Sequence, residues 1–196
     1  MALGIIKMME KLLLVGAGGF GRVVMEHAIE QQYEVAFVDD GYDIGAEVCS
    51  TKIVGHIEDL AILFRDYKKL VVAIGNNKFR ESVYKKAEEI GYDFPNIICK
   101  SVYISPFSKI GKGCVLLNNV CVQNGASVGN GVLLNPGVEI HHDGTVDDYA
   151  LIYSNSVVRT MAYIGKRVKI GSTCTISNEV VIESDQIIED GNTVTK

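Results

Sequence analysis

A histidine pair followed by an aspartate, His141-His142-Asp143, is the group in this sequence best suited to acid–base chemistry. An imidazole can take up or release a proton near neutral pH, and a neighbouring carboxylate can hold its ring in one tautomer. The pattern therefore predicts His142 as a general base and Asp143 as the group that orients it. The structural alternative is a pair of surface histidines in a turn.

A glycine-rich turn near the start of the chain forms the second such group. Residues 16–21 read GAGGFG and lie between an apolar run and a segment with helical spacing. Glycines let the backbone approach a phosphate at a helix N-terminus, and a carboxylate about 20 residues later can hold a ribose hydroxyl or a base edge. We predict a nucleotide site; the alternative is that the glycines only pack the first helix on its strand. The predicted substrate-binding positions are Gly16, Gly18, Gly19, Phe20, Gly21, Arg22, Asp39, Asp40, Gly75 and Asn76.

The elements that must position this turn can be read from the first half of the chain. Apolar runs predict strands at 11–15, 33–40 and 70–74, and helical spacing predicts helices at 22–32 and 78–90, with Asn76 or Asn77 as a cap. A full dinucleotide fold needs two such halves, and fewer than about 100 residues precede the second half of the chain. We therefore expect a Rossmann-like α/β domain for a mononucleotide or nucleotide sugar.

The second half carries a strict six-residue repeat. Sixteen successive positions six apart are aliphatic: Ile104, Ile110, Leu116, Val122, Val128, Leu134, Ile140, Val146, Ile152, Val158, Ile164, Ile170, Ile176, Ile182, Ile188 and Val194. The residue two places before each is mostly small, as Cys114, Ala126 and Ala162 illustrate. A period of six is typical of a left-handed parallel β-helix with three short strands per coil, whereas a sandwich would have period two. We predict a Rossmann-like domain at 1–98 and an all-β left-handed β-helix at 99–196, with His142 at a corner.

Composition narrows the class of protein. The chain has 196 residues, a formal net charge of −5 and 47% hydrophobic residues, which fits a globular protein and speaks against a nucleic-acid partner. No apolar run approaches the length of a membrane span, and the opening MALGIIKMMEK is too short for a signal peptide. The cysteines form no C-x-x-C pair, so we expect reduced thiols, no metal and a cytoplasmic protein. They are Cys49, Cys99, Cys114, Cys121 and Cys174.

Four segments together resemble one known family. GAGGFGRVV, VAFVDD, VAIGNNKFR and LNPGVEIHHD, at residues 16–24, 35–40, 72–80 and 134–143, resemble the bacterial sugar O-acyltransferases related to sialic-acid O-acetyltransferases. Within that family the chain looks most like the hexapeptide-repeat nucleotide 4-amino-sugar N-acetyltransferases. The resemblance implies a homotrimer with acetyl-CoA as co-substrate between adjacent β-helices and with no metal. It also implies His142 as the base, Asp143 as its partner, and Asn135, seven residues before His142, as a substrate contact.

The chain departs from the family pattern around the acyl donor. Phe20 stands where the family commonly has histidine, and Leu151 replaces a second histidine about nine residues after the base. Residues 153–160 lack the usual glycines, and the sequence ends at Lys196 without the family's C-terminal segment. The acetyl-CoA-binding positions expected from the resemblance are Leu151, Thr160, Lys166 and Arg167. For the basic residues, a charged solvent face is the commoner explanation.

The sequence is compatible with three functions. The leading hypothesis is acetyl-CoA-dependent N-acetylation of a nucleotide-activated 4-amino-sugar in surface-glycan biosynthesis. A sugar O-acetyltransferase of the sialic-acid type would use the same base on a hydroxyl. A catalytically silent nucleotide-sugar-binding trimer would explain the departures at Phe20 and Leu151.

Overall fold

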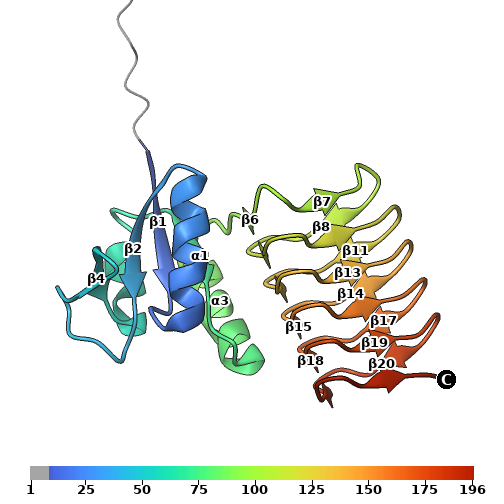
Figure 1. Cartoon of the computed structure of the whole chain (residues 1–196). Coiled ribbons are helices and arrows are strands. Elements are labelled where there is room, and N and C mark those ends of the chain that lie inside the picture. The colour runs from blue at the N-terminus through green and yellow to red at the C-terminus, as the bar shows by residue number, and fades with distance from the viewer. Residues whose placement is uncertain (1–8) are drawn as a thin grey trace, which may run out of the picture.

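The computed structural model describes residues 9–196 and divides them into an α/β domain and a β-helix that lie side by side (Figure 1). Most of the opening segment MALGIIKMMEK, residues 1–8, lies outside the described residues, so the prediction about it stays a prediction. No helix among residues 9–196 is long and apolar enough to cross a membrane.

The N-terminal domain is built on a five-stranded sheet in the order β3-β4-β2-β1-β5. Its strands are β1 (Glu10–Val15), β2 (Tyr33–Val38), β3 (Glu47–Val48), β4 (Thr51–Gly55) and β5 (Lys69–Val72). Its helices are α1 (Gly19–Glu30), the short η1 (Ile57–Asp59), α2 (Leu60–Leu63) and α3 (Asn77–Ile90). β1 pairs in parallel with both β2 and β5, so the strands that precede the two long helices end at one edge of the sheet.

The predicted elements are present, with shifted ends. Helix α1 begins at Gly19, three residues before the predicted start, because the glycine turn is itself the first turn of the helix. A Cβ atom on Gly21 would lie 1.8 Å from the carbonyl oxygen of Gly16, so this position needs glycine for the helix to pack on β1. Helix α3 is capped by Asn76, whose side chain accepts a hydrogen bond from the amide of Phe79. The β3–β4 hairpin and α2 carry no period that the sequence analysis detected.

The β-helix consists of two-residue strands in three parallel sheets. One sheet, here called the docked sheet, contains β6 (Ile97–Ile98), β9 (Val115–Leu116), β12 (Leu133–Leu134), β15 (Leu151–Ile152), β18 (Lys169–Ile170) and β21 (Ile187–Ile188). The β7 sheet contains β7 (Tyr103–Ile104), β10 (Cys121–Val122), β13 (Glu139–Ile140), β16 (Val157–Val158), β19 (Thr175–Ile176) and β22 (Thr193–Val194). The β8 sheet contains β8 (Lys109–Ile110), β11 (Ser127–Val128), β14 (Thr145–Val146), β17 (Tyr163–Ile164) and β20 (Val181–Ile182).

The repeated aliphatic side chains form the axis of the β-helix, as predicted. Val122 pairs with Ile140 and Ile140 with Val158, so equivalent residues stack 18 positions apart in consecutive coils. Twelve of the sixteen repeat positions belong to one buried cluster, and the four in the first and last coils pack against its ends. The small neighbours, such as Ala126 and Ala162, are buried beside them. The fold class expected from the period of six is confirmed.

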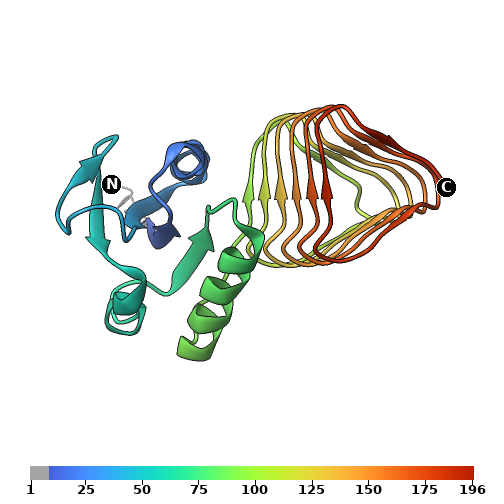
Figure 2. The ribbon, with the colours of Figure 1, turned by 90° about the horizontal axis from the view of Figure 1, so that it is seen from below.

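The docked sheet lies against the N-terminal domain (Figure 2). Its outward residues Val115, Leu133 and Leu151 share one buried cluster with Leu12 and Val71 of the α/β sheet. Because β6 already pairs with β9, the first β-helix strand starts at Ile97. The predicted division of the chain between residues 98 and 99 stays a prediction.

Two of the three corners of the β-helix differ in their surroundings: one is far from the N-terminal domain, and the other lies next to α3. The outer corner joins the β7 and β8 sheets through turns at 105–108, 123–126, 141–144, 159–162 and 177–180, and the chain ends beside it. Figure 2 looks along the coils and shows this end of the chain at the corner furthest from the N-terminal domain. The docked corner joins the β8 sheet to the docked sheet through turns at 111–114, 129–132, 147–150 and 165–168, next to α3.

Candidate active site

The predicted base and its partner form a hydrogen-bonded pair at the outer corner. His142 Nδ1 lies 2.9 Å from Asp143 Oδ2. A carboxylate can only accept, so Nδ1 carries the proton and Nε2 is the basic, accepting nitrogen when the ring is neutral. About half of each side chain is exposed, at 55% for His142 and 60% for Asp143. The pair has the arrangement expected of a general base that faces solvent.

Residues from the neighbouring coils hold this pair on both sides. Gln123, from the coil before, accepts a hydrogen bond from the backbone amide of His142 through its Oε1 atom, at 3.1 Å. Thr160, from the coil after, has its Oγ1 atom 3.0 Å from His142 Nε2. Consecutive coils of parallel strands lie about 4.8 Å apart, so a side chain reaches the next coil directly. The predicted residue Thr160 therefore lies at the His142 side chain.

Backbone conformation places the Asp143 carboxylate. Asp143 has a φ of 60°, in the left-handed region, and occupies the turn position that Gly125 holds one coil earlier, at a φ of 71°. A Cβ atom on Gly125 would lie 2.2 Å from Asp143 Oδ1. The carboxylate thus occupies space that is open only because residue 125 is glycine.

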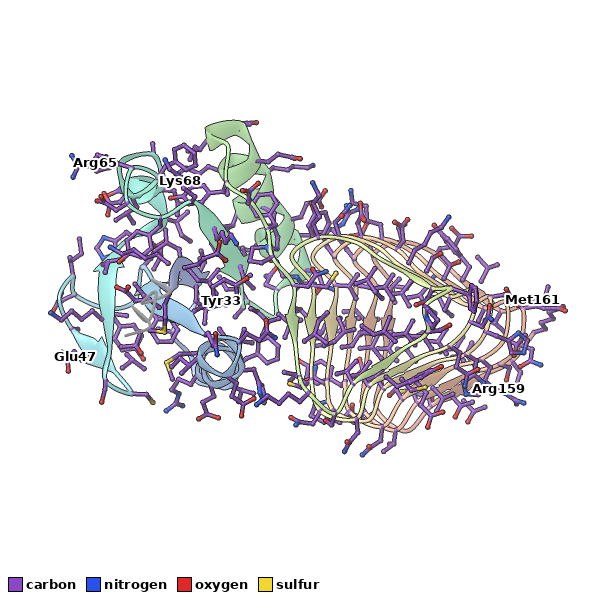
Figure 3. The ribbon with its side chains drawn as sticks, turned by 90° about the horizontal axis from the view of Figure 1, so that it is seen from above. Tyr33, Glu47, Arg65, Lys68, Arg159 and Met161 are labelled. Carbon is purple, nitrogen blue, oxygen red and sulfur yellow. The ribbon has the colours of Figure 1, made fainter. Side chains whose placement is uncertain are left out.

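The outer corner lies on the far side of the β-helix from the N-terminal domain. Figure 3 shows Arg159 and Met161, in the turn one coil after His142, at the tip opposite Tyr33 and Lys68 of that domain. Met161 is exposed, and its backbone amide donates to the carbonyl of His142. Arg159 is also exposed and forms no ion pair within residues 9–196. The His142 corner is consequently remote from the glycine turn of its own chain.

The glycine turn lines a pocket of about 420 Å³ at the carboxyl edge of the α/β sheet. Of the predicted substrate-binding positions, the pocket lining includes Gly16, Gly18, Gly19, Phe20, Gly21, Asp39 and Asp40, and it is completed by Ile57, Ala73, Ile74 and Phe79 among others. The side chain of Arg22 is exposed on the first turn of α1 and lies outside this lining. The sequence pattern and the folded pocket therefore agree on most of these positions.

Both aspartates that follow β2 hold the loops around the pocket in place by accepting hydrogen bonds from backbone amides. Asp39 accepts from the amide of Ala17 at 2.7 Å and from that of Gly41 at 2.8 Å. Asp40 Oδ1 accepts from the amide of Ile57 at 2.8 Å. Asp39 thereby ties the glycine turn to the next strand, while Asp40 keeps its second carboxylate oxygen available to a ligand.

The second predicted helix start opens beside this pocket and reaches the β-helix. A Cβ atom on Gly75 would lie 3.8 Å from the side chain of Leu151, which is 2% exposed in the interdomain cluster. Asn135 lies at the third corner of the β-helix, where its Nδ2 donates to the carbonyl of Ile152. Asn135 and His142 thus stand at opposite ends of strand β13.

The two basic residues expected to bind the acyl donor form ion pairs at the interface between the N-terminal domain and the β-helix, called the seam below. Lys166 and Arg167, in the docked corner, both contact the carboxylate of Glu81 on α3, at 3.0 and 2.8 Å. Arg167 also pairs with Asp185 at 2.6 Å, which raises the pKa of its guanidinium. Burial would raise the pKa of Glu81, but hydrogen bonds from Lys166, Lys85 and Arg167 outweigh it and lower this pKa to about 2. The structure places neither residue near His142.

An arginine that the sequence analysis did not select joins the domains. Arg80 on α3 is fully buried and donates to the carbonyls of Ile74 in its own domain and of Gly131, Tyr149 and Ala150 in the docked corner. Burial lowers the pKa of Arg80 to about 10. Only its place in the VAIGNNKFR segment sets this residue apart from other arginines, and that pattern does not show its partners.

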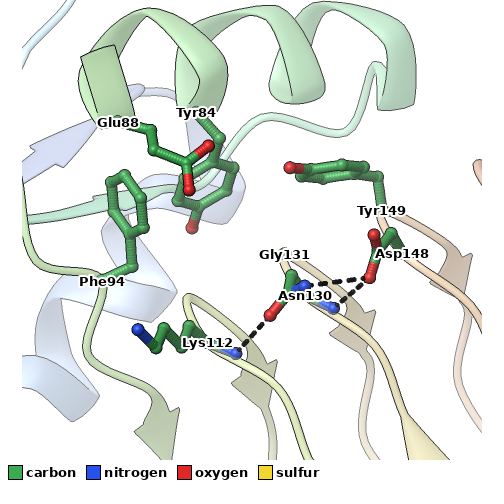
Figure 4. Close-up of a pocket in the computed structure, with 8 residues that line it drawn as sticks. All are labelled: Tyr84, Glu88, Phe94, Lys112, Asn130, Gly131, Asp148 and Tyr149. Carbon is green, nitrogen blue, oxygen red and sulfur yellow. Dashed lines mark hydrogen bonds between the residues drawn. The ribbon is translucent and has the colours of Figure 1, made fainter.

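A second hollow of about 350 Å³ lies on the same seam (Figure 4). Tyr84 of α3 forms one wall, and its hydroxyl bridges the amide of Val72 and the carbonyl of Gly113. Asn130 and Asp148 form the opposite wall, where Asp148 accepts from Asn130 along the stack of turns. These contacts hold the domains together, and the hollow contains none of the predicted site residues. No group of three His, Cys, Asp or Glu side chains suited to a metal ion occurs within the described chain.

Comparison with known proteins agrees with both halves of the fold. Residues 11–87 match the model of the PglD N-terminal domain family. The structure of PerB from Caulobacter crescentus in complex with CoA and GDP-perosamine superposes with a TM-score of 0.90 at 26% identity, covering 95% of this chain and 89% of that one.

A second solved structure and a curated protein are also similar to this chain. The acetyltransferase domain of PglB from Neisseria gonorrhoeae in complex with acetyl coenzyme A gives a TM-score of 0.84 at 28% identity, covering 95% and 96% of the two chains. Among curated proteins, the bifunctional protein GlmU of Alkaliphilus metalliredigens is 26% identical over 106 residues, or 52% of this chain. That match spans 21% of the length of GlmU.

The resemblance found in the four sequence segments is confirmed by these comparisons. The N-terminal domain matches by family, and the arrangement of both domains matches solved acetyltransferases over nearly their full lengths. Residues 11–87 match the PglD N-terminal domain family, and the whole chain is similar to hexapeptide-repeat acetyltransferases.

Proposed function

We propose that this protein transfers the acetyl group of acetyl-CoA to the 4-amino group of a nucleotide-activated sugar. The observation that carries the proposal is the His142–Asp143 pair, which leaves a basic imidazole nitrogen on a solvent-facing corner. The glycine pocket, with Asp39 fixing the turn, supplies a separate place for the nucleotide. PerB and the PglB domain, which superpose on nearly the whole of this chain, were solved with CoA and GDP-perosamine or with acetyl coenzyme A.

The chemistry follows from the charges that develop in acyl transfer. His142 accepts the proton that the sugar amine loses as its nitrogen bonds to the thioester carbonyl carbon, and Asp143 stabilises the resulting imidazolium through Nδ1. The carbonyl oxygen becomes negative and needs a donor. The backbone amide of Thr160 donates no hydrogen bond within residues 9–196 and lies in the turn next to His142, so we assign it this role. The imidazolium then protonates the departing thiolate.

The separation between the glycine pocket and the His142–Asp143 pair within one chain supports a trimer. The glycine pocket lies in the N-terminal domain, which packs against the docked sheet, while His142 lies at the outer corner of the β-helix. A nucleotide sugar held in the pocket of one chain therefore meets the His142 corner of a neighbouring chain. Three copies with parallel β-helices would form three such sites by closed symmetry. We assign Asn135 to the substrate side of this junction and place the reaction in the cytoplasm, where acetyl-CoA is available.

Thiol release from acetyl-CoA tests the function. The assay uses UDP-, dTDP- and GDP-linked 4-amino-sugars as acceptors, with the matching 4-hydroxy sugars as controls, and compares the natural chain with His142→Ala. We expect turnover with at least one amino-sugar and a loss of about 100-fold or more in the variant. Turnover with hydroxy sugars alone would identify an O-acetyltransferase, and nucleotide binding without any turnover would identify a binding protein.

Mixing two inactive variants tests the shared site. His142→Ala is refolded together with Gly18→Tyr, which places a ring in the glycine pocket, because a Cβ atom on Gly18 meets no atom within 4 Å. Active mixed trimers, alongside a trimeric mass for the natural chain, would support a site built from two chains. A monomeric mass would contradict it.

A further inference from the structure

The Nε2 atom of His142 has a hydrogen-bond partner of its own in the next coil. Asp143 accepts a hydrogen bond from Nδ1–H, so neutral His142 can only accept at Nε2. The Thr160 hydroxyl, 3.0 Å away, must therefore donate to it. A hydroxyl in this position uses its single hydrogen on the imidazole and keeps oxygen lone pairs for another donor.

The direction of that hydrogen bond determines which protein group the amine of the acceptor substrate contacts first. Thr160 lies one coil after His142, so the Nε2 lone pair points along the stack of coils. The other sides of the residue are held by Asp143 in the same turn and by Gln123 from the preceding coil. An acceptor that approaches the corner from solvent therefore meets the Thr160 hydroxyl beside the imidazole nitrogen.

The Thr160 side chain is held firmly in this place. Its neighbour Met161 has a φ of 57° and donates its amide to the carbonyl of His142, and the Thr160 carbonyl accepts from Glu179 on the following coil. A β-branched side chain also has few χ1 rotamers, so little rotational freedom is lost when the hydroxyl acts. Backbone hydrogen bonds to the preceding and the following coil therefore hold the turn that carries Thr160.

We propose that Thr160 is a catalytic residue that relays the acceptor's proton to His142. This rests on the acyl transfer proposed above and adds a second group to it. As the acceptor nitrogen forms its bond to the thioester carbon, its N–H proton moves to Thr160 Oγ1, and the Thr160 proton moves to His142 Nε2. When the C–S bond breaks, the imidazolium proton returns through the same hydroxyl to the thiolate. Both residues end in their starting protonation states.

Two substitutions separate the hydroxyl from the shape of the side chain. Thr160→Val keeps the branched shape and removes the relay, whereas Thr160→Ser keeps a hydroxyl. We expect Thr160→Val to lower kcat by about 100-fold with KM for both substrates unchanged, and Thr160→Ser to restore most of the rate. Thr145→Val, on the outward face of β14, is the matched control, because that hydroxyl makes no hydrogen bond to the described side chains.

Solvent deuterium content supplies a readout that a merely structural role would not change. Two protons move together in a relay, so the rate of the natural chain should depend on deuterium fraction along a curve, and that of Thr160→Val along a straight line. A valine variant with natural or higher kcat, or curved dependence in both proteins, would overturn the relay. Failure of the proposed function looks different, since the natural chain itself would then release no thiol.

Discussion

The outer and docked corners of the β-helix have the same backbone and opposite uses. Asp143 and Met161 in the outer corner, and Tyr149 and Arg167 in the docked corner, all have φ values between 57° and 60°. In the docked corner the side chains and carbonyls are covered by α3, whereas in the outer corner they remain exposed. The repeat therefore fixes the turn, and the neighbouring element decides whether that turn stabilises the fold or carries chemistry.

Arg80→Ala should break the docked corner and have the largest effect on stability. The substitution leaves the carbonyls of Ile74, Gly131 and Tyr149 without this donor in a buried seam and opens a cavity. We expect a loss of about 4 kcal/mol in the free energy of unfolding. Urea unfolding followed by circular dichroism measures it, with Arg22→Ala on the exposed face of α1 as control. Equal stability of the two variants would contradict the role of Arg80.

Gly125→Ala should act on the outer corner and change turnover more than stability. The new methyl group meets Asp143 Oδ1 and must displace that carboxylate, and alanine at positive φ costs about 1 kcal/mol. Gly137→Ala is a matched control, because it has a φ of 73° and a similarly close contact, but with Asn155. We expect equal losses of stability in the two variants and a loss of kcat that is much larger in Gly125→Ala. Equal kcat values would show that the Asp143 position is unimportant.

Glu81→Gln should weaken the docked corner in a pH-dependent way, with the smallest effect of the three. The pKa of Glu81 is lowered from 4.5 to about 2, so its ion pairs stabilise the fold above pH 4.5 and are lost as pH falls toward 2. The midpoint of thermal unfolding should therefore differ between the natural chain and the variant at pH 6, and the difference should shrink from pH 4.5 to pH 2. A difference that is constant with pH would exclude the carboxylate charge as its cause.

The limits of sequence-based prediction differ between the two domains. A period of six predicts every strand of the β-helix from β7 onward, because each repeat must bury one aliphatic residue in the same axis. The segment from Gly41 to Tyr67 has no comparable period, so its β3–β4 hairpin and short helices were not predicted. In the site, Gln123 and Gly125 are ordinary turn residues in the sequence and become neighbours of His142 and Asp143 only through the 18-residue register.

The sequence by itself determined the local chemistry of this protein. The glycine turn, the aspartates after β2 and the His142–Asp143 pair are each encoded within a few adjacent residues, and the repeat dictates the β-helix. Only the tertiary structure decided which side chains contact the His142–Asp143 pair and which form the interface between the two domains. Lys166 and Arg167 were expected to bind acetyl-CoA or to lie on a charged solvent face, yet α3 brings Glu81 to them. Thr160 reaches His142 because coils stack at a fixed register. Contacts between distant segments depend on how coils and domains pack, and spacing along the chain does not contain that information.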